Sequence, residues 1–166
     1  MTIAVSAVFG VVFALASLGV LYGRFRKVTV PKPRYWSTPR PLVACDPSLA
    51  APTAEAITRL RAIGLPIDWA GSPSMATITV RADASLDDRA SVDDGAPSLH
   101  GITHSRTDAD GWTFGADVRV LPWASAVVIA HELCHALGYE HPNPWPPSGH
   151  LLHPTRPGWD ARGIAS

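Results

Sequence analysis

The chain has 166 residues, enough for one domain with a hydrophobic core, and a formal net charge of zero. The zero hides an asymmetry, because all 14 acidic residues lie beyond residue 40, together with only eight of the 14 basic ones. That part of the chain therefore carries a net charge of −6, which argues against nucleic-acid binding.

An uncharged, apolar stretch at residues 3–22 dominates the N-terminal part of the chain. Twenty helical residues span about 30 Å, the hydrocarbon thickness of a bilayer. We therefore expect residues 1–23 to form a transmembrane segment that binds the lipid bilayer. A cleaved signal peptide is the alternative. Against it, no basic residue precedes the apolar run, and the run continues past Ala16, where a cleavage site would fall.

Residues 24–41 are basic and rich in proline, which predicts a semi-rigid linker beside the membrane. Basic side chains in this position suit anionic lipid. Because lysine and arginine follow the apolar run and none precedes it, the positive-inside rule favours a domain on the cytoplasmic side. An extracytoplasmic or secreted domain is the alternative. Trp36 either contacts lipid headgroups or packs against the domain.

The remainder, residues 42–166, is expected to form one α+β domain. A strand is expected around Val43, and a helix over residues 52–63, with Gly64 following its end. Residues 75–81 alternate apolar and polar side chains, which predicts another strand.

A β-hairpin is expected over residues 101–120. Residues 101–106 form its first strand, and Asp108-Ala109-Asp110-Gly111 is a favourable turn. Residues 112–120 alternate with period two, which is typical of a half-buried strand. This alternation puts five side chains on one face: Trp112, Phe114, Ala116, Val118 and Val120.

The pattern HExxHxxGxxH occupies residues 131–141. Four helical steps leave His131 and His135 about 40° apart and about 6 Å along the axis, so both can reach one metal ion. Gly138 is expected to end the helix, and the turn can return His141 as a third nitrogen ligand. Three protein ligands leave one position for water, which is the arrangement of a catalytic zinc. The alternative is a helix that carries surface histidines without a metal.

With this motif the chain resembles the metzincin zinc metallopeptidases, and among them the matrixin-like branch. The resemblance implies that His131, His135 and His141 hold one zinc ion and that Glu132 is the general base. It also implies a minimal metzincin domain: a twisted mixed sheet with an edge strand, two main helices and a small C-terminal part. The expected activity is that of an endopeptidase, in which Glu132 takes the proton of a zinc-bound water that attacks a peptide carbonyl.

Two further features follow from the resemblance. The family has a methionine in a tight turn under the metal; here Leu152 occupies that position, and Pro154 matches the proline that follows in the family. The family also pairs an edge strand with an extended substrate, so a protein or peptide substrate is expected to bind along Gly101, Ile102, Thr103 and His104. Matrixins bind calcium near the region that corresponds to residues 83–98. This stretch is either a calcium site or a solvated acidic loop.

Two other functions remain open. Leu152 keeps open a catalytically weak or inactive module that retains the fold for binding. The other is a structural membrane protein in which the histidines hold a metal for stability alone. A closed structural site requires a fourth protein ligand, for which Cys134 and Glu140 are the candidates. The two cysteines, Cys45 and Cys134, are too few for a disulfide framework and are expected to be free.

Overall fold

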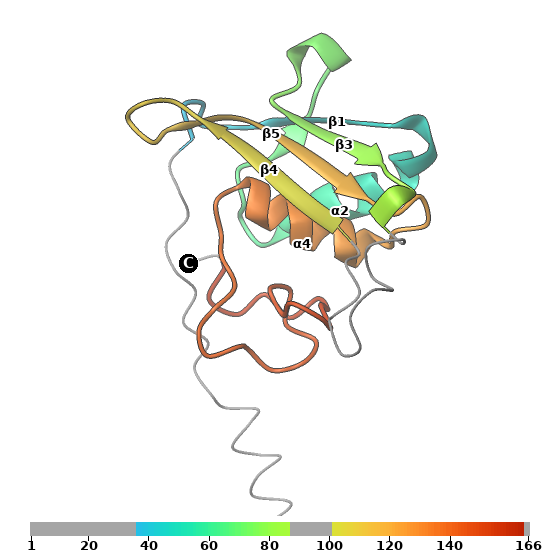
Figure 1. The fold of residues 1–166 in the computed structure, drawn as a ribbon, viewed down its shortest axis with the longest axis vertical. Helices are drawn as coiled ribbons and strands as arrows, with labels where there is room; N and C mark the ends of the chain where they lie inside the picture. Colours follow the sequence, from blue (N-terminus) through green and yellow to red (C-terminus); the bar gives the residue numbers. More distant parts are fainter. Residues whose placement is uncertain (1–35, 87–100, 165–166) are drawn as a thin grey trace, which may run out of the picture.

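A five-stranded sheet and two helices make up the fold in the computed structural model, which describes residues 36–86 and 101–164. The strands run in the spatial order β2-β1-β3-β5-β4. Both helices lie against one face of the sheet, and a coil after α4 continues beyond them (Figure 1). The elements are β1 (Leu42–Cys45), α2 (Ala50–Ala62), β2 (Asp68–Trp69), β3 (Ile78–Ala82), β4 (Gly101–Thr107), β5 (Thr113–Val120) and α4 (Ala126–Ala136), with short 3-10 helices at Pro47–Leu49 and Pro73–Met75.

The sheet is mixed, as expected for the α+β class. β1, β2, β3 and β5 are parallel, and β4 is an antiparallel strand at one edge. The predicted strand over residues 75–81 begins later than expected, at Ile78, because Met75 belongs to a 3-10 helix. Proline fixes the backbone angle that opens a helical turn, and Pro73 stands at the start of this one. The two-residue strand β2 was not predicted.

The hydrophobic core lies between the sheet and the two helices. Inward side chains of β1, β3 and β5 contribute fully buried aliphatic groups, and α2 and α4 face them with their apolar stripes. This packing fixes α4 as a rigid support. The largest contributors are Val43, Ile57, Leu60, Ile78, Val80, Val118, Val120, Ile129 and Leu133.

A β-bulge corrects the predicted face of the hairpin. Arg106 pairs with Gly115 and Thr107 pairs with Thr113, so β5 has an extra residue, Phe114, between the two pairs. A bulge reverses the alternation beyond it. As a result, Thr113 is buried, and Phe114 is 48% exposed. Trp112, at 43% exposure, also lies outside the core. The prediction was right only for Ala116, Val118 and Val120, which are buried.

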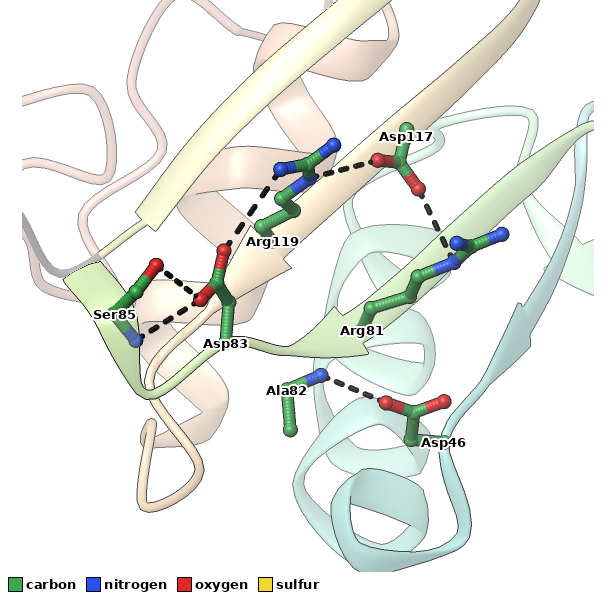
Figure 2. Close-up of polar contacts among 7 residues, drawn as sticks. All are labelled: Asp46, Arg81, Ala82, Asp83, Ser85, Asp117 and Arg119. Carbon is green, nitrogen blue, oxygen red and sulfur yellow. Dashed lines mark hydrogen bonds and ion pairs between the residues drawn. The ribbon is translucent and has the colours of Figure 1, made fainter.

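The opposite face of the sheet is polar and solvated. Arg81 and Arg119 both approach Asp117, at 3.4 and 3.0 Å, and Arg119 also lies 3.9 Å from Asp83 (Figure 2). Near the end of β3, Asp46 accepts a hydrogen bond from the Ala82 backbone at 2.8 Å. Ion pairs this exposed contribute little stability. They mark a face of the sheet that is in contact with solvent, whereas the other face packs against the two helices.

The N-terminal end of the described chain is fastened to the domain. Trp36 forms a bridge with Thr113, and its indole N–H donates to the Ala136 carbonyl at 3.1 Å. Trp36 therefore packs on the domain. Within residues 36–86 and 101–164, neither helix has the length and apolar character that crossing a membrane requires. The expected transmembrane segment lies outside the described residues, as do Asp87, Asp88, Asp93 and Asp94 of the expected acidic loop.

Candidate metal centre

Helix α4 positions two of the three motif histidines and then ends sharply. His131 and Glu132 are each only 6% exposed on this buried helix. Gly138 has a φ of 92°, and its N–H donates to the His135 carbonyl at 2.9 Å, while the Tyr139 N–H donates to the Cys134 carbonyl at 3.0 Å. A left-handed residue with these bonds closes a helix and reverses the chain. The reversal brings His141 back to the helix, as the sequence predicted.

The three histidines converge on one point. The Nε2 atom of His135 lies 3.1 Å from that of His131 and 3.1 Å from that of His141, and the remaining pair is 3.2 Å apart. With zinc–nitrogen bonds of 2.0–2.1 Å, tetrahedral geometry places two nitrogen ligands about 3.3 Å apart. The spacing therefore fits a single zinc ion.

Backbone carbonyls decide which ring nitrogen carries the proton. His131 Nδ1 lies 2.6 Å from the Leu151 carbonyl oxygen, and His135 Nδ1 lies 2.7 Å from that of Tyr139. A carbonyl only accepts hydrogen bonds, so in both rings Nδ1 must be the donor. A neutral ring then has a bare lone pair at Nε2, and two such lone pairs facing each other repel. A cation between them would relieve the repulsion, so the donor set suits a metal ion.

Burial keeps two of these rings neutral. It lowers the pKa of His131 to about 3 and that of His141 to about 4, and the nearby His135 lowers both further in the same direction. Metal binding requires deprotonated imidazole nitrogens. These two ligands are therefore ready to bind a metal at neutral pH without first losing a proton.

Within residues 36–86 and 101–164, no fourth protein ligand joins the cluster. Among the described residues, the potential ligand atoms that lie within 4.8 Å of one another come from these three histidines alone. Cys134 is fully buried in the core, and burial raises the pKa of its thiol, which disfavours the thiolate that binds metals. Neither Cys134 nor Glu140 belongs to the cluster. The part of the chain that the structure describes thus offers three potential protein ligands, the number typical of an open site.

Glu132 lies beside the cluster. Its side chain packs against the first residues of β4, Gly101 and Thr103. The Thr103 hydroxyl lies 2.7 Å from Glu132 Oε2 and 3.0 Å from the Glu132 carbonyl oxygen. Burial raises the pKa of the Glu132 carboxyl, and the Thr103 hydrogen bond and His135 oppose that rise. A carboxylate with a raised pKa is a stronger proton acceptor, which is the property a general base needs.

The turn at residues 150–154 contacts the metal centre through the hydrogen bond between His131 and the Leu151 carbonyl. Leu152 is fully buried in the core, and its N–H donates to His150 Nδ1 at 3.1 Å. The other nitrogen of the buried His150 ring donates to the Arg162 carbonyl at 3.0 Å. This histidine ties the turn to the C-terminal segment. Pro154 is half-buried.

A cleft of about 360 Å³ opens next to His135. β4 forms one wall with Thr103, His104 and Ser105. The other wall consists of His135 in α4 and of Gly138, Tyr139 and Glu140 in the turn that follows the helix. Of the four residues predicted to contact substrate, Thr103 and His104 line this cleft. Gly101 instead lies against Glu132, and Ile102 is half-buried outside the lining.

Sequence reasoning did not identify the supporting groups. It assigned no role to the carbonyls of Leu151 and Tyr139, to His150, or to the contact between Thr103 and Glu132. Only Gly138 gave a local signal, because a glycine in the motif predicts the turn that places the Tyr139 carbonyl.

The fold and site together define an α+β domain with a three-histidine candidate metal centre. No protein-family model matches the chain, and the curated proteins include none with significant similarity to it.

Proposed function

We propose that this protein is a zinc-dependent endopeptidase. One observation carries the proposal: three Nε2 atoms meet within 3.2 Å, with the protons of two rings fixed on the opposite nitrogen. Beside them stands the buried carboxyl of Glu132. Three imidazole ligands with an adjacent glutamate are the components of a hydrolytic zinc site.

The roles of the residues follow from their chemistry. His131, His135 and His141 would hold zinc, which when bound supplies a Lewis acid that makes a water more acidic and polarises a carbonyl. Glu132 would accept the proton of the attacking water and deliver it to the amine that leaves. The carboxyl suits both steps, because burial raises its pKa toward the working range of a general base.

An extended peptide is the proposed substrate. β4 is the edge strand of the sheet, paired on one side only by β5 among the described residues. Its open edge borders the cleft that contains His135. A peptide that adds to this edge would form backbone hydrogen bonds with β4 and lie across the metal centre. Calcium in the acidic loop remains a separate proposal, because its candidate residues lie outside the described part of the chain.

We further propose that residues 3–22 anchor the domain to a lipid bilayer, with the positive-inside rule favouring the cytoplasmic side. The support is the uncharged length of this segment and the basic residues that follow it. Protease treatment of intact cells and of lysed cells would show the side: a domain that is cut only after lysis faces the cytoplasm, and one cut in intact cells does not.

Metal analysis and a peptide-cleavage assay test the enzymatic function together. The parent should bind one zinc per chain and cleave an unfolded protein substrate. Glu132→Gln removes the base and keeps the ligands, so it should retain zinc and lose cleavage. The lack of bound zinc in the parent would overturn the proposal. Zinc without cleavage of any peptide in a proteome-derived library would favour the binding module.

A further inference from the structure

We propose that the start of β4 positions the general base: Thr103 holds the Glu132 carboxylate, and Gly101 leaves the space that this carboxylate fills. The inference rests on the proposed role of Glu132. It assigns Thr103 and Gly101 as positioning residues, a role beyond the substrate contacts expected from the sequence.

The Thr103 hydroxyl is the group that orients the carboxylate. It lies 2.7 Å from Glu132 Oε2, a short distance that suits an O–H donor and an ionised acceptor. Its only proton can alternatively go to the Glu132 carbonyl oxygen at 3.0 Å. Both acceptors belong to Glu132, so either bond ties β4 to this residue of α4.

Gly101 encloses the same carboxylate from the neighbouring strand position on this face. A Cβ atom at residue 101 would lie 2.6 Å from Glu132 Cγ and 2.8 Å from Glu132 Oε1. Real Cβ atoms do not come this close to other atoms, so any larger residue would displace the glutamate side chain. Oε2 is thus held by a hydrogen bond, and Oε1 lies where only glycine leaves room.

This arrangement gives the edge strand two tasks. Residues 101 and 103 lie on the face of β4 that contacts Glu132. The open edge of the same strand borders the cleft. A peptide bound along that edge would lie on the strand that orients the base. Because β4 would contact both the Glu132 carboxylate and the peptide, it would fix their positions relative to each other.

Carboxyl NMR tests the contact directly in metal-free protein. The chain has three glutamates, Glu55, Glu132 and Glu140, so labelling the glutamate side-chain carboxyl carbon gives three signals. Glu132→Gln identifies the signal of interest by its loss. Thr103→Val, which keeps the shape and removes the hydroxyl, should shift that signal, and Thr103→Ser should restore it. Thr107→Val, the same change on an exposed residue of β4, should leave it in place.

Kinetics of the zinc-loaded protein provide the second readout. Loss of a group that orients a reacting residue typically costs about 10–100-fold. Thr103→Val should lower kcat by that factor with KM and zinc stoichiometry unchanged, and Thr103→Ser should recover most of the loss. Gly101→Ala should lower kcat as well, although this variant keeps the Thr103 hydroxyl, because the added Cβ atom would displace the Glu132 side chain.

The two readouts separate this inference from the proposed function. An unchanged Glu132 signal in folded Thr103→Val would overturn the positioning role, whatever the activity. A shifted signal in Thr103→Val and an unshifted one in Thr107→Val would support it even if the parent cleaved no peptide, in which case the proposed function alone would fail.

Discussion

The Nδ1 atom of His131 lies 2.6 Å from the carbonyl oxygen of Leu151, and this bond joins the metal centre to the turn below it. The bond fixes both the orientation of the ring and the position of its proton. Hydrogen bonds of this kind to the outer nitrogen of a ligand raise its basicity and affect metal affinity. The neighbouring side chain, that of Leu152, is fully buried and shapes the same turn.

The Leu152 side chain should support the metal centre only by filling hydrophobic space, so methionine should serve equally well at this position. Leu152→Met conserves volume and should cost less than about 1.5 kcal/mol of unfolding free energy. Leu152→Ala opens a cavity and should cost about 2–5 kcal/mol. Urea unfolding of the zinc-loaded variants measures both values. If Leu152→Met raised the zinc affinity or the cleavage rate about tenfold, the sulfur atom would contribute more than hydrophobic packing.

Zinc should stabilise the folded protein through all three histidines. A ligand that binds only the folded state adds about 2.7 kcal/mol at a free concentration 100 times its Kd. Thermal unfolding should therefore show a higher Tm with zinc than with a chelator. His141→Ala should abolish this difference, because it removes one of the three converging Nε2 atoms. Glu132→Gln is the matched control and should keep the difference; a histidine variant that kept it too would contradict the assigned ligand set.

The metal-free protein should lose stability as the pH falls below 6.5. Burial lowers the pKa of His131 to about 3 in the folded state, against an ordinary value of 6.5. Between these values the unfolded chain binds a proton that the folded chain does not. The free energy of unfolding from this group is therefore at its full value above pH 6.5, and it falls by about 1.4 kcal/mol per pH unit down to about pH 3.

Glu132 contributes with the opposite sign, so the pH experiment belongs in the Glu132→Gln background. Its raised pKa means that the folded state keeps a proton longer, and stability from this group falls as pH rises through that pKa. Urea unfolding between about pH 5 and 6.5 avoids most other carboxyl groups. Adding His131→Gln should reduce the slope, and part of the slope that remains comes from His141, whose pKa burial also lowers. An equal slope with and without His131 would show that its ring is not buried in its neutral form.

The parts of the site that could be predicted are those set by neighbours in sequence. The helical period places His131 and His135 together, and Gly138 permits the reversal that returns His141. Each of these depends on backbone geometry within about ten residues. The same applies to β5, where period two correctly predicted the buried positions from Ala116 onward.

The parts that could not be predicted depend on contacts between distant segments. Thr103 and Glu132 are separated by 29 residues, and His131 and Leu151 by 20. No local sequence pattern predicts which hydroxyl will contact Glu132 or which carbonyl will contact His131. The bulge at Phe114 was missed for the same reason, because it is defined by the register between β4 and β5 and alternation in one strand alone does not encode register.

Cys134 should be inert in the native protein, which distinguishes an open zinc site from a structural one that uses this thiol. It is fully buried, and burial raises its pKa, so little thiolate is available to react. With iodoacetamide, Cys45, which is partly exposed, should be modified first in native metal-free protein, and Cys134 should react only after unfolding in urea. Because the pKa of Cys45 is also raised, the comparison depends on access more than on ionisation. Rapid modification of native Cys134 that zinc prevented would instead place the thiol at the metal.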